Sequence, residues 1–595
     1  MISNLRSRSQ TFLRSLAVAL FAAAAAVPVH PQENRTSTFP KREVRAVWIA
    51  TINGLDWPKS AVAAEQQESL RRMVVELRRA HFNTIFFQVR GRGDAMYRSR
   101  FEPWAQSLTG TFGKDPGWDP LQFLLDTAHA YGIEVHAWVN TYLIKSSRLE
   151  TPETTPRHIV LDHPEWLRNV EGEYWIDPGI PPARKYLADV VLDLVTRYDV
   201  DGIQFDFIRY PARPFQDDAT FKKYGGKSSR ADWRRENVTA FVRDVYGKIH
   251  TARPEVKVGS APIGIYQNFG SVRGLQSYSD LSQDSRLWLK EGIQDYLVPQ
   301  VYWSLGAQPG DPDFAEVARE WSAQRFGRHL YLGVGAYKPD VHGQLPELID
   351  ISRSLNVRGN AFFRYENISD VMAMGGRYAS PANIPPMPWI DSIPPLPPQN
   401  LQVTFDAGKE AGGIFTLHWT FPQNGPREAA YCNIYRSTSQ PLDTGDPLNI
   451  LAIVPSTAGM YADTIRHPVS GKYYYAVSGF DRGNNESAAT PAQSVTMPEV
   501  LALSREFSPV NALGDCFRQP SSTLVYFPYE VEKPSPVFVK ILDGNNIEVA
   551  TVVDAVQQAG SYIAAADISR LSRGNYTCMF IAGEYTEKKS FRVDR

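Results

Sequence analysis

An acidic residue at the end of an apolar run is the first candidate for chemistry in this sequence. Residues 200–211 read Val-Asp-Gly-Ile-Gln-Phe-Asp-Phe-Ile-Arg-Tyr-Pro, and Asp206 follows the apolar part of that run. A carboxylate at the end of a buried strand is costly unless it is paired with a cation or takes part in a reaction. We therefore expect Asp206 to be catalytic, with a structural ion pair between Asp206 and Arg209 as the alternative.

Hydrolysis of a glycosidic bond is one reaction that such a residue serves, and it needs a second carboxyl group. Asp284 and Asp94 are the leading candidates for that second group, followed by Glu366. Two of them have a structural alternative. Asp284 could cap a helix beginning near Ser285, because Asp is a favoured N-cap residue, and Asp94 could hold its Gly-rich loop.

Other polar and aromatic side chains lie on the apolar runs or follow them. Amides and charged groups suit sugar hydroxyls, and aromatic faces suit the C–H surfaces of sugars. Trp48 and Trp138 could instead be core residues, because Trp is highly buried on average, and His136 could be a hydrogen-bonded core histidine. The predicted substrate-binding residues are Arg45, Trp48, Gln88, Arg90, His136, Trp138, Asn140, Tyr210, Gln300, Tyr302, Trp303, Tyr337 and Glu366.

The elements that position these residues are eight short apolar runs alternating with amphipathic helices between residues 41 and 380. Runs that are apolar on both faces are typical of parallel strands covered on both sides, and eight strand–helix units predict an α/β fold, a (β/α)₈ TIM barrel. A doubly wound open sheet is the alternative, but no Gly-rich nucleotide loop follows a strand. The predicted strands are Val44–Thr51, Thr84–Arg90, Glu134–Asn140, Gly202–Phe207, Lys257–Ala261, Tyr296–Tyr302, Leu330–Gly335 and Gly359–Arg364.

The rest of the chain changes character at a Pro-rich stretch, residues 381–399, which is typical of a stiff linker. Alternating apolar and polar residues then predict two small all-β sandwich domains. Residues 400–499 resemble a fibronectin type III module, and residues 500–595 loosely resemble a small Ig-like domain. Some Ig-like domains at the end of exported bacterial proteins serve in sorting or surface attachment, so attachment to the cell envelope is a further expectation.

The first thirty residues are typical of a secretory signal peptide. Basic residues precede the Ala-rich run Ser15–Val27, which is short for a membrane span, and Ala24 and Ala26 offer a cleavage site. A short membrane anchor is the alternative. We expect an exported protein that is periplasmic, surface-displayed or secreted. In an oxidising compartment Cys516 and Cys578 could pair, or both could remain isolated thiols.

Composition excludes several classes of partner and cofactor. The formal net charge is −1, so bulk electrostatics predict neither nucleic-acid nor anionic-membrane binding. The 13 Trp, 28 Tyr and 29 Phe are compatible with a carbohydrate-binding protein. The chain contains no recognisable metal-binding motif, so we expect neither a metal nor another cofactor.

Seven segments, in order over residues 41–370, resemble the bacterial glycosyl-hydrolase-like family ten. That family implies a TIM-barrel glycoside hydrolase, acting in bacteria on peptidoglycan glycan strands, and it supports Asp284 and Asp94 as site residues. It often has a second Asp directly after the strand-four Asp, whereas this chain has Phe207. The segments are Val44–Thr51 with Asp56–Pro58, Asn83–Arg90 with Gly93–Ala95, Trp118–Pro120, His136–Asn140, Asp201–Asp206 with Tyr210–Pro211, Asp284–Arg286 with Trp288, and Asp295–Trp303.

Together these observations predict a metal-independent hydrolase of O-glycosidic bonds that uses two carboxyl groups on a polysaccharide. The alternative is a non-catalytic glycan-binding protein, with the same barrel and aromatic residues but no working acid–base pair.

Overall fold

The computed structural model describes residues 39–147, 150–306, 311–368, 377–378, 380–406, 413–465, 471–497, 511–514, 516–518, 524–557, 560–569 and 571–593. The predicted signal peptide, residues 1–30, lies outside these ranges.

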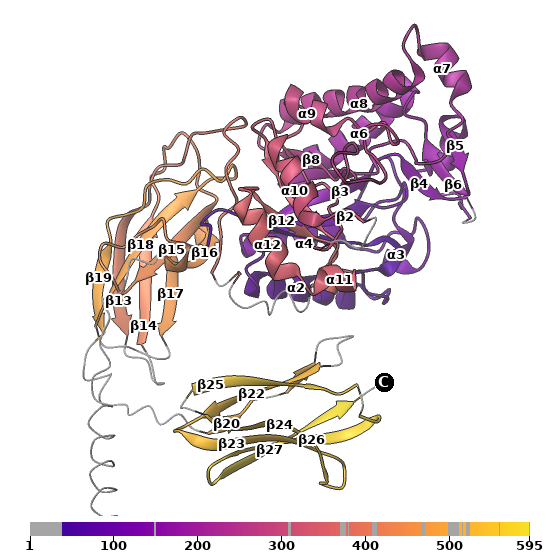
Figure 1. Ribbon diagram of the computed structural model, residues 1–595. Helices are drawn as coiled ribbons and strands as arrows, with labels where there is room; N and C mark the ends of the chain where they lie inside the picture. Colours follow the sequence, from indigo (N-terminus) through magenta and orange to yellow (C-terminus); the bar gives the residue numbers. More distant parts are fainter. Residues whose placement is uncertain are drawn as a thin grey trace, which may run out of the picture. The chain divides into compact units, whose positions relative to one another are not determined.

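A nine-stranded parallel sheet curls into a nearly closed barrel in the first part of the chain (Figure 1). Each of the eight predicted runs contains a strand, and the seventh contains two short ones, β10 and β11, on either side of Tyr331. Because β10 pairs with β9 and β11 pairs with β12, this interrupted strand joins the two ends of the sheet. The predicted TIM barrel is therefore confirmed. Its strands are β1 (Val44–Ile49), β2 (Thr84–Arg90), β3 (Glu134–Asn140), β7 (Gly202–Asp206), β8 (Lys257–Ser260), β9 (Tyr296–Leu297), β10 (His329–Leu330), β11 (Leu332–Val334) and β12 (Gly359–Phe362).

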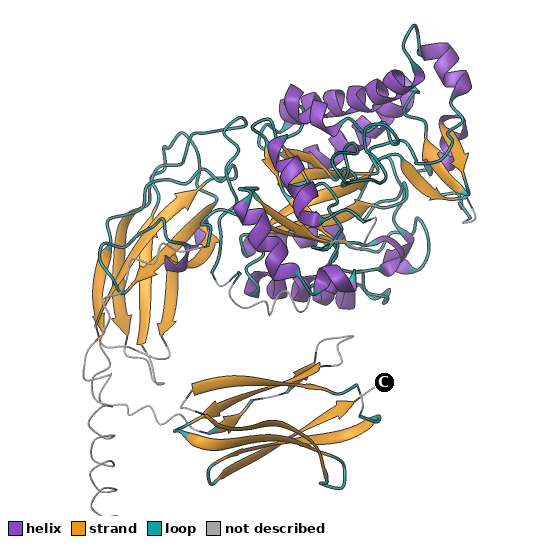
Figure 2. Ribbon diagram, in the orientation of Figure 1, coloured by secondary structure: helices purple, strands orange, loops and turns teal. Residues whose placement is uncertain are grey.

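Helices surround these strands (Figure 2) and cover their outer face. In α2, Leu70, Met73, Val74 and Leu77 form the buried stripe that their spacing predicts, and they belong to the large apolar core that contains the outward-facing strand residues. The helices are α2 (Ala63–Arg79), α3 (Gln106–Thr109), α4 (Pro120–Ala130), α5 (Ile159–Asp162), α6 (Pro181–Arg197), α7 (Asp218–Tyr224), α8 (Arg230–Ala252), α9 (Ser285–Glu291), α10 (Phe314–Ala323), α11 (Pro339–His342) and α12 (Leu345–Ser354). None of the helices in the described ranges is long and apolar enough to cross a membrane.

A second, smaller core fills the barrel interior with aromatic rings. Trp48, Phe86, Trp138 and Tyr296 pack there with small residues from neighbouring strands. Glycine makes room for one of these rings, because a Cβ atom on Gly259 would lie only 2.3 Å from the Tyr296 ring. The interior is thus packed solid below the mouth, and any site must lie above it, among the loops that follow the strands.

The loop after β3 is the most elaborate of these. It carries an antiparallel sheet in the order β4–β6–β5, formed by β4 (Leu143–Ser146), β5 (Leu167–Val170) and β6 (Glu173–Ile176). Its strand β4 and His158, which precedes α5, supply one wall of the mouth described below.

After the Pro-rich stretch the described chain is almost entirely β-structure (Figure 2). The first module has the sheets β13–β14–β17 and β16–β15–β18–β19, and the second has β24–β23–β26–β27 facing strands β20, β21, β22 and β25. The predicted β-strands are confirmed, while the likeness to fibronectin type III and Ig-like domains stays a prediction. The strands are β13 (Gln399–Asp406), β14 (Gly413–Thr420), β15 (Tyr431–Ser437), β16 (Ile450–Pro455), β17 (Met460–Ile465), β18 (Gly471–Phe480), β19 (Gln493–Met497), β20 (Ala512–Leu513), β21 (Phe517–Arg518), β22 (Leu524–Val531), β23 (Ser535–Leu542), β24 (Glu548–Gln557), β25 (Gly560–Asp567), β26 (Gly574–Ala582) and β27 (Tyr585–Val593). Cys516 and Cys578 are not joined by the disulfide bond considered above.

Candidate active site

A cavity of about 320 Å³ opens at the carboxyl ends of the barrel strands, where TIM barrels carry their active sites. It is lined from β1, β2, β3, β7 and the segments that follow β8, β9 and β12. Seven of the predicted site residues line it: Trp48, Gln88, Trp138, Asn140, Asp206, Gln300 and Tyr302.

Asp206 is the acidic residue of this cavity. It ends β7, and its Oδ1 accepts a hydrogen bond of 2.7 Å from the backbone N–H of Phe207. Within the described ranges its carboxylate forms no ion pair, so the expected alternative of a structural pair with Arg209 does not hold. Burial raises the pKa of Asp206 to about 6, against the opposing effects of the Phe207 N–H and the Arg209 charge. A carboxyl group with this pKa can hold and release a proton near neutral pH.

Aromatic rings form one side of the cavity. Phe363, which the sequence did not single out, lies at the centre of this group. Its ring centroid is 6.0 Å from that of Trp48, 6.3 Å from that of Trp138 and 5.9 Å from that of Tyr302. Burial raises the pKa of Tyr302 well above its ordinary value, and the nearby Asp206 charge raises it further. Tyr337, half exposed at the rim, packs edge-on against Tyr302 and Phe363. These rings offer apolar faces on which a sugar ring can lie.

Two of the four amides that line the cavity, Gln88 and Asn140, also fix the loops around it. Gln88 accepts hydrogen bonds from the backbone N–H groups of Thr51 (3.1 Å) and Ile52 (2.9 Å). Asn140 accepts one from the indole of Trp138 and donates one to the carbonyl of Gly91. Their roles in positioning are therefore clear from the structure, and both still face the cavity.

Phe207 stands where the related family often has a second Asp, and it too lines the cavity. Its backbone has φ of +48°, a left-handed conformation that bulky residues rarely adopt. The ring packs edge-on against Trp175, and the Arg209 guanidinium lies 5.0 Å from its centroid. Strained residues of this kind cluster at functional sites, and this one supplies a further aromatic face next to Asp206.

The structure contradicts the prediction that Arg45, Arg90 and His136 bind substrate. Arg45 and His136 lie at the starts of their strands, at the opposite end of the barrel. Arg45 is fully buried against Glu43, and His136 is buried and bonded to the hydroxyl of Tyr296. Arg90 ends β2 but is buried in an ion pair with Glu102 and lines neither mouth cavity.

Three further predicted residues lie outside this cavity as well. Tyr210 is buried against Phe215, with its hydroxyl at 3.4 Å from the amide of Asn237. Trp303 packs against the outer core, and Glu366 pairs with Arg364 at 2.7 Å. These positions contradict a direct role in binding at this cavity.

Asp284 does not line the Asp206 cavity either, so the structure does not support a catalytic role for Asp284. Its carboxylate accepts hydrogen bonds from the N–H of Leu287 at 3.3 Å, at the start of α9, and from the hydroxyl of Tyr266 at 2.6 Å. Asp284 therefore caps a helix, which was the structural alternative.

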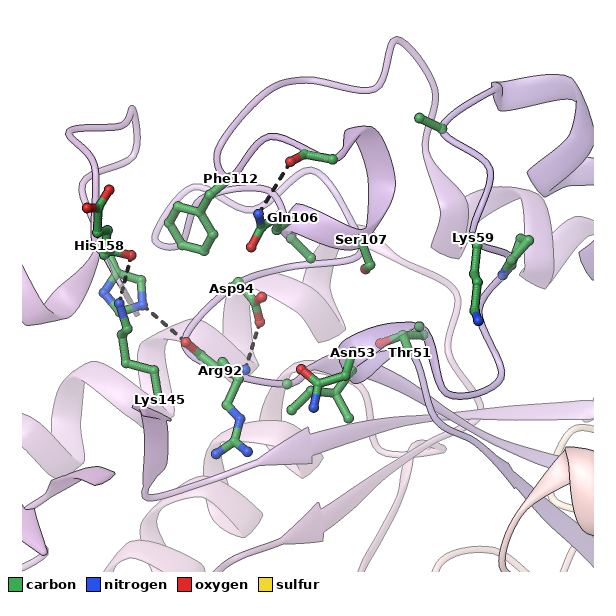
Figure 3. A pocket seen from close by; sticks show the side chains of 18 residues that line it. Thr51, Asn53, Lys59, Arg92, Asp94, Gln106, Ser107, Phe112, Lys145 and His158 are labelled. Atoms are coloured by element: carbon green, nitrogen blue, oxygen red, sulfur yellow. Dashed lines mark hydrogen bonds between the residues drawn. The ribbon is translucent and has the colours of Figure 1, made fainter. Parts of the chain in front are cut away.

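Asp94 lies in a second cavity of about 380 Å³, beside the first (Figure 3). Ile52, Asn53 and Arg92 line both cavities, so the two adjoin. Asp94 accepts a hydrogen bond of 2.7 Å from the N–H of Arg92, and burial raises its pKa. The loop-holding alternative is thus seen in the structure, and the catalytic hypothesis for Asp94 stays a prediction. The sequence did not single out Arg92. It follows β2 by two residues and so lies in one of the loops where TIM barrels carry their active sites.

The described residues contain no group of three or more His, Cys, Asp or Glu side chains that could hold a metal ion. The Asp206 cavity thus offers one acid with a raised pKa, four amides and several aromatic faces. It supplies one of the two carboxyl groups that glycoside hydrolysis needs, together with surfaces on which a sugar can lie.

Comparison with known proteins decides the family. The profile described as Glycosyl hydrolase-like 10 matches residues 43–344, which is half of the chain and most of the barrel. The chain belongs to this family. The resemblance inferred from its sequence segments is thereby confirmed.

Two relatives span the same region and are themselves named as hydrolases. Glycosyl hydrolase YngK of Bacillus subtilis is 31% identical over 514 residues, covering 80% of this chain and 97% of YngK. Glycosyl hydrolase DigH of Escherichia coli K12 is 32% identical over 385 residues, covering 58% of this chain and 87% of DigH. The family and these relatives support a glycoside hydrolase.

Among solved structures, the PgaB glycoside hydrolase domain of Bordetella bronchiseptica aligns with a TM-score of 0.39 at 13% identity. That alignment covers 57% of this chain and 100% of the domain. The barrel itself is established by the strand order described above.

Proposed function

We propose that this protein is an exported glycoside hydrolase that cleaves O-glycosidic bonds of peptidoglycan glycan strands, with Asp206 as the general acid. The observation that carries the proposal is the Asp206 carboxyl group: it faces a cavity at the barrel mouth, has a pKa of about 6 and has no cation partner among the described residues. Export rests on the predicted signal peptide. In a bacterium, peptidoglycan is the polysaccharide that an exported enzyme meets in the envelope.

In the proposed reaction, protonated Asp206 gives its proton to the glycosidic oxygen as the bond to the anomeric carbon breaks. The aromatic faces of Trp48, Trp138 and Phe207 hold the sugar rings. A second carboxyl group then acts as nucleophile or activates a water molecule. Asp94 is the candidate that remains, because Asp284 and Glu366 are held by other partners.

The test is cleavage of purified glycan strands that lack stem peptides. Wild-type protein should shorten the strands, and Asp206→Asn should reduce kcat by about 10³-fold or more, since the general acid is lost. Asp244→Asn is a matched control, because Asp244 is an exposed carboxylate on α8. Undiminished cleavage by Asp206→Asn would remove the central assignment.

The alternative of a non-catalytic glycan-binding protein keeps one specific observation in its favour. Asp206 is the only carboxylate among the described residues that line its cavity. In the same experiment, tight binding of strands without shorter products would support this alternative. Turnover that falls in Asp94→Asn, while strand affinity stays unchanged, would instead support Asp94 as the second carboxyl group.

Attachment to the cell envelope through the β-modules is a separate part of the proposal. A protein that ends at Pro395 should still be exported, but it should no longer be found in the envelope fraction. If the truncated protein fractionates like the full chain, the modules do not attach it.

A further inference from the structure

The cavity that contains Asp94 extends the candidate active site toward a wall that carries basic side chains. Three of its lining residues are basic: Lys59, Arg92 and Lys145. Figure 3 shows Lys145 on one side of the cavity and Lys59 on the other, with Arg92 between them. Arg92 also lines the Asp206 cavity, so the two cavities share this side chain.

Arg92 has hydrogen-bonding capacity that the protein leaves unused. Its Nη1 is buried and has no hydrogen-bond partner in the described part of the chain. The nearest carboxylate oxygen, on Glu173, is 3.8 Å from Nη1, which is too long for a hydrogen bond. A buried donor without a partner is unfavourable, so a ligand oxygen at this position would be stabilised.

Glu173 forms a long ion pair with Arg92, but the two acidic residues that line the cavity, Asp94 and Glu150, form none with it among the described residues. Asp94 accepts a hydrogen bond from the backbone N–H of Arg92, but the Arg92 side chain runs away from the Asp94 carboxylate (Figure 3), and the two form no ion pair among the described residues. Glu150 is exposed, and it is the backbone carbonyl of Glu150, rather than its carboxylate, that accepts a hydrogen bond from Lys145. Lys59, on the opposite side, is exposed, lines the cavity and forms no ion pair within the described ranges.

His158, on the same wall as Lys145, is neutral and fixes the loop that carries Arg92. Burial lowers the pKa of His158 to about 4, so the ring is uncharged near neutral pH. Its Nδ1 accepts the N–H of Val160, so Nε2 carries the proton and donates to the carbonyl of Arg92 at 3.1 Å. Gly93 permits this contact, because a Cβ there would lie 2.9 Å from His158 Nε2 and φ is +68°. The backbone that carries Arg92 is therefore held in place before any ligand arrives.

We propose that this second cavity is a subsite for an acidic sugar residue, with Arg92 binding the sugar's carboxylate and Lys59 adding to the attraction. The inference rests on the proposed function and names its substrate more closely: a glycan in which the residue next to the cleaved bond carries a free carboxylate. In peptidoglycan strands that group is the lactyl carboxylate of the muramyl residue. A guanidinium binds a carboxylate through two parallel N–H···O bonds, which fixes the orientation of the sugar as well as adding affinity.

The test compares two substrates that differ only in charge: glycan strands with free lactyl carboxylates, and the same strands after conversion of these groups to methylamides. Wild-type protein should prefer the free carboxylate by about tenfold or more in kcat/KM, and the preference should fall with added salt. Arg92→Gln should abolish the preference, Arg92→Lys should keep part of it, and Lys59→Gln should reduce it. Arg243→Gln is the matched control, because Arg243 is an exposed arginine on α8, and it should leave the preference unchanged.

The ratio between the two substrates separates this proposal from the general function. Cleavage of both substrates at equal rates by wild type, or an unchanged ratio in Arg92→Gln, would overturn the subsite while leaving the hydrolase intact. If neither is cleaved, equilibrium binding of the same strands supplies the same ratio, and equal or absent binding again overturns it. Binding of oligouronates but not of muramyl strands would overturn the assignment of the carboxylate to the muramyl residue.

Discussion

The two ends of the barrel bury the same kind of side chain to opposite effect. At the floor, Glu134 begins β3 and forms an ion pair with Lys257, which begins β8. Burial alone would raise the pKa of Glu134, but the Lys257 ammonium and His136 hold it at about 2. At the mouth, Asp206 is also buried, has no such partner in the described ranges, and has a pKa of about 6. Pairing, rather than burial, therefore accounts for the difference between the pKa values of these two carboxyl groups.

The largest effect should come from breaking the floor pair. Lys257→Met leaves Glu134 buried without its cation, which we expect to lower the free energy of unfolding by about 3–5 kcal/mol. Urea unfolding followed by tryptophan fluorescence measures this. The exposed Lys248→Met on α8 should change it by less than about 0.5 kcal/mol. Equal stability of the two variants would show that the floor pair is not what holds Glu134.

At the mouth, removing the charge should stabilise the protein instead. The folded-state pKa of Asp206 is raised from 3.8 to about 6, so ionisation opposes folding above pH 6. Asp206→Asn should therefore increase the free energy of unfolding at pH 7.5 by up to about 3 kcal/mol. Below about pH 3 Asp206 is protonated in both the folded and unfolded states, so the gain should vanish. A gain that is the same at pH 4 and pH 7.5 would contradict the raised pKa.

The same pKa should appear in catalysis. A general acid must be protonated, so kcat/KM should fall about tenfold per pH unit as the pH rises above about 6. A pH–rate profile on glycan strands measures this limb, and the Asp244→Asn control should keep it. A limb of the opposite sign, with activity lost as the pH falls through 6, would make Asp206 the base or nucleophile and call for another acid.

The sequence predicted the barrel well, because each buried parallel strand is a short apolar run that needs no knowledge of its neighbours. It predicted Asp206 for the same reason: a lone carboxylate ending such a run needs a function or a partner. It could not predict which way a side chain faces once a strand becomes irregular. Arg90 ends β2 after a shift in register that follows Gln88, and it lies opposite Val139, an outward-facing residue of the outer core. This irregularity turns Arg90 away from the mouth, whereas Gln88 still lines it.

Other misses come from partners that are distant in the sequence. The cap that Asp284 forms at the start of α9 was the alternative that the sequence offered, but its hydrogen bond from the Tyr266 hydroxyl, 18 residues earlier, could not be predicted. Phe363 and Arg92 were overlooked because their neighbours are cavity residues from other strands. Only the assembled mouth shows that a lone aromatic ring or guanidinium is part of a site.

Substitutions of Phe207, at the mouth, should have a smaller effect on stability than Lys257→Met or Asp206→Asn, and they test the mouth alone. Its φ of +48° is easy for glycine and strained for residues with a Cβ. We expect Phe207→Gly to be more stable than Phe207→Ala by about 1 kcal/mol, the reverse of the usual order, measured by urea unfolding. Both variants should bind glycan strands about tenfold more weakly, because both lose the aromatic face beside Asp206, while Phe207→Tyr should bind normally. If Ala proves the more stable, the backbone is not strained at this position. If all three variants bind alike, the ring that replaces the family's second carboxylate takes no part in holding the sugar.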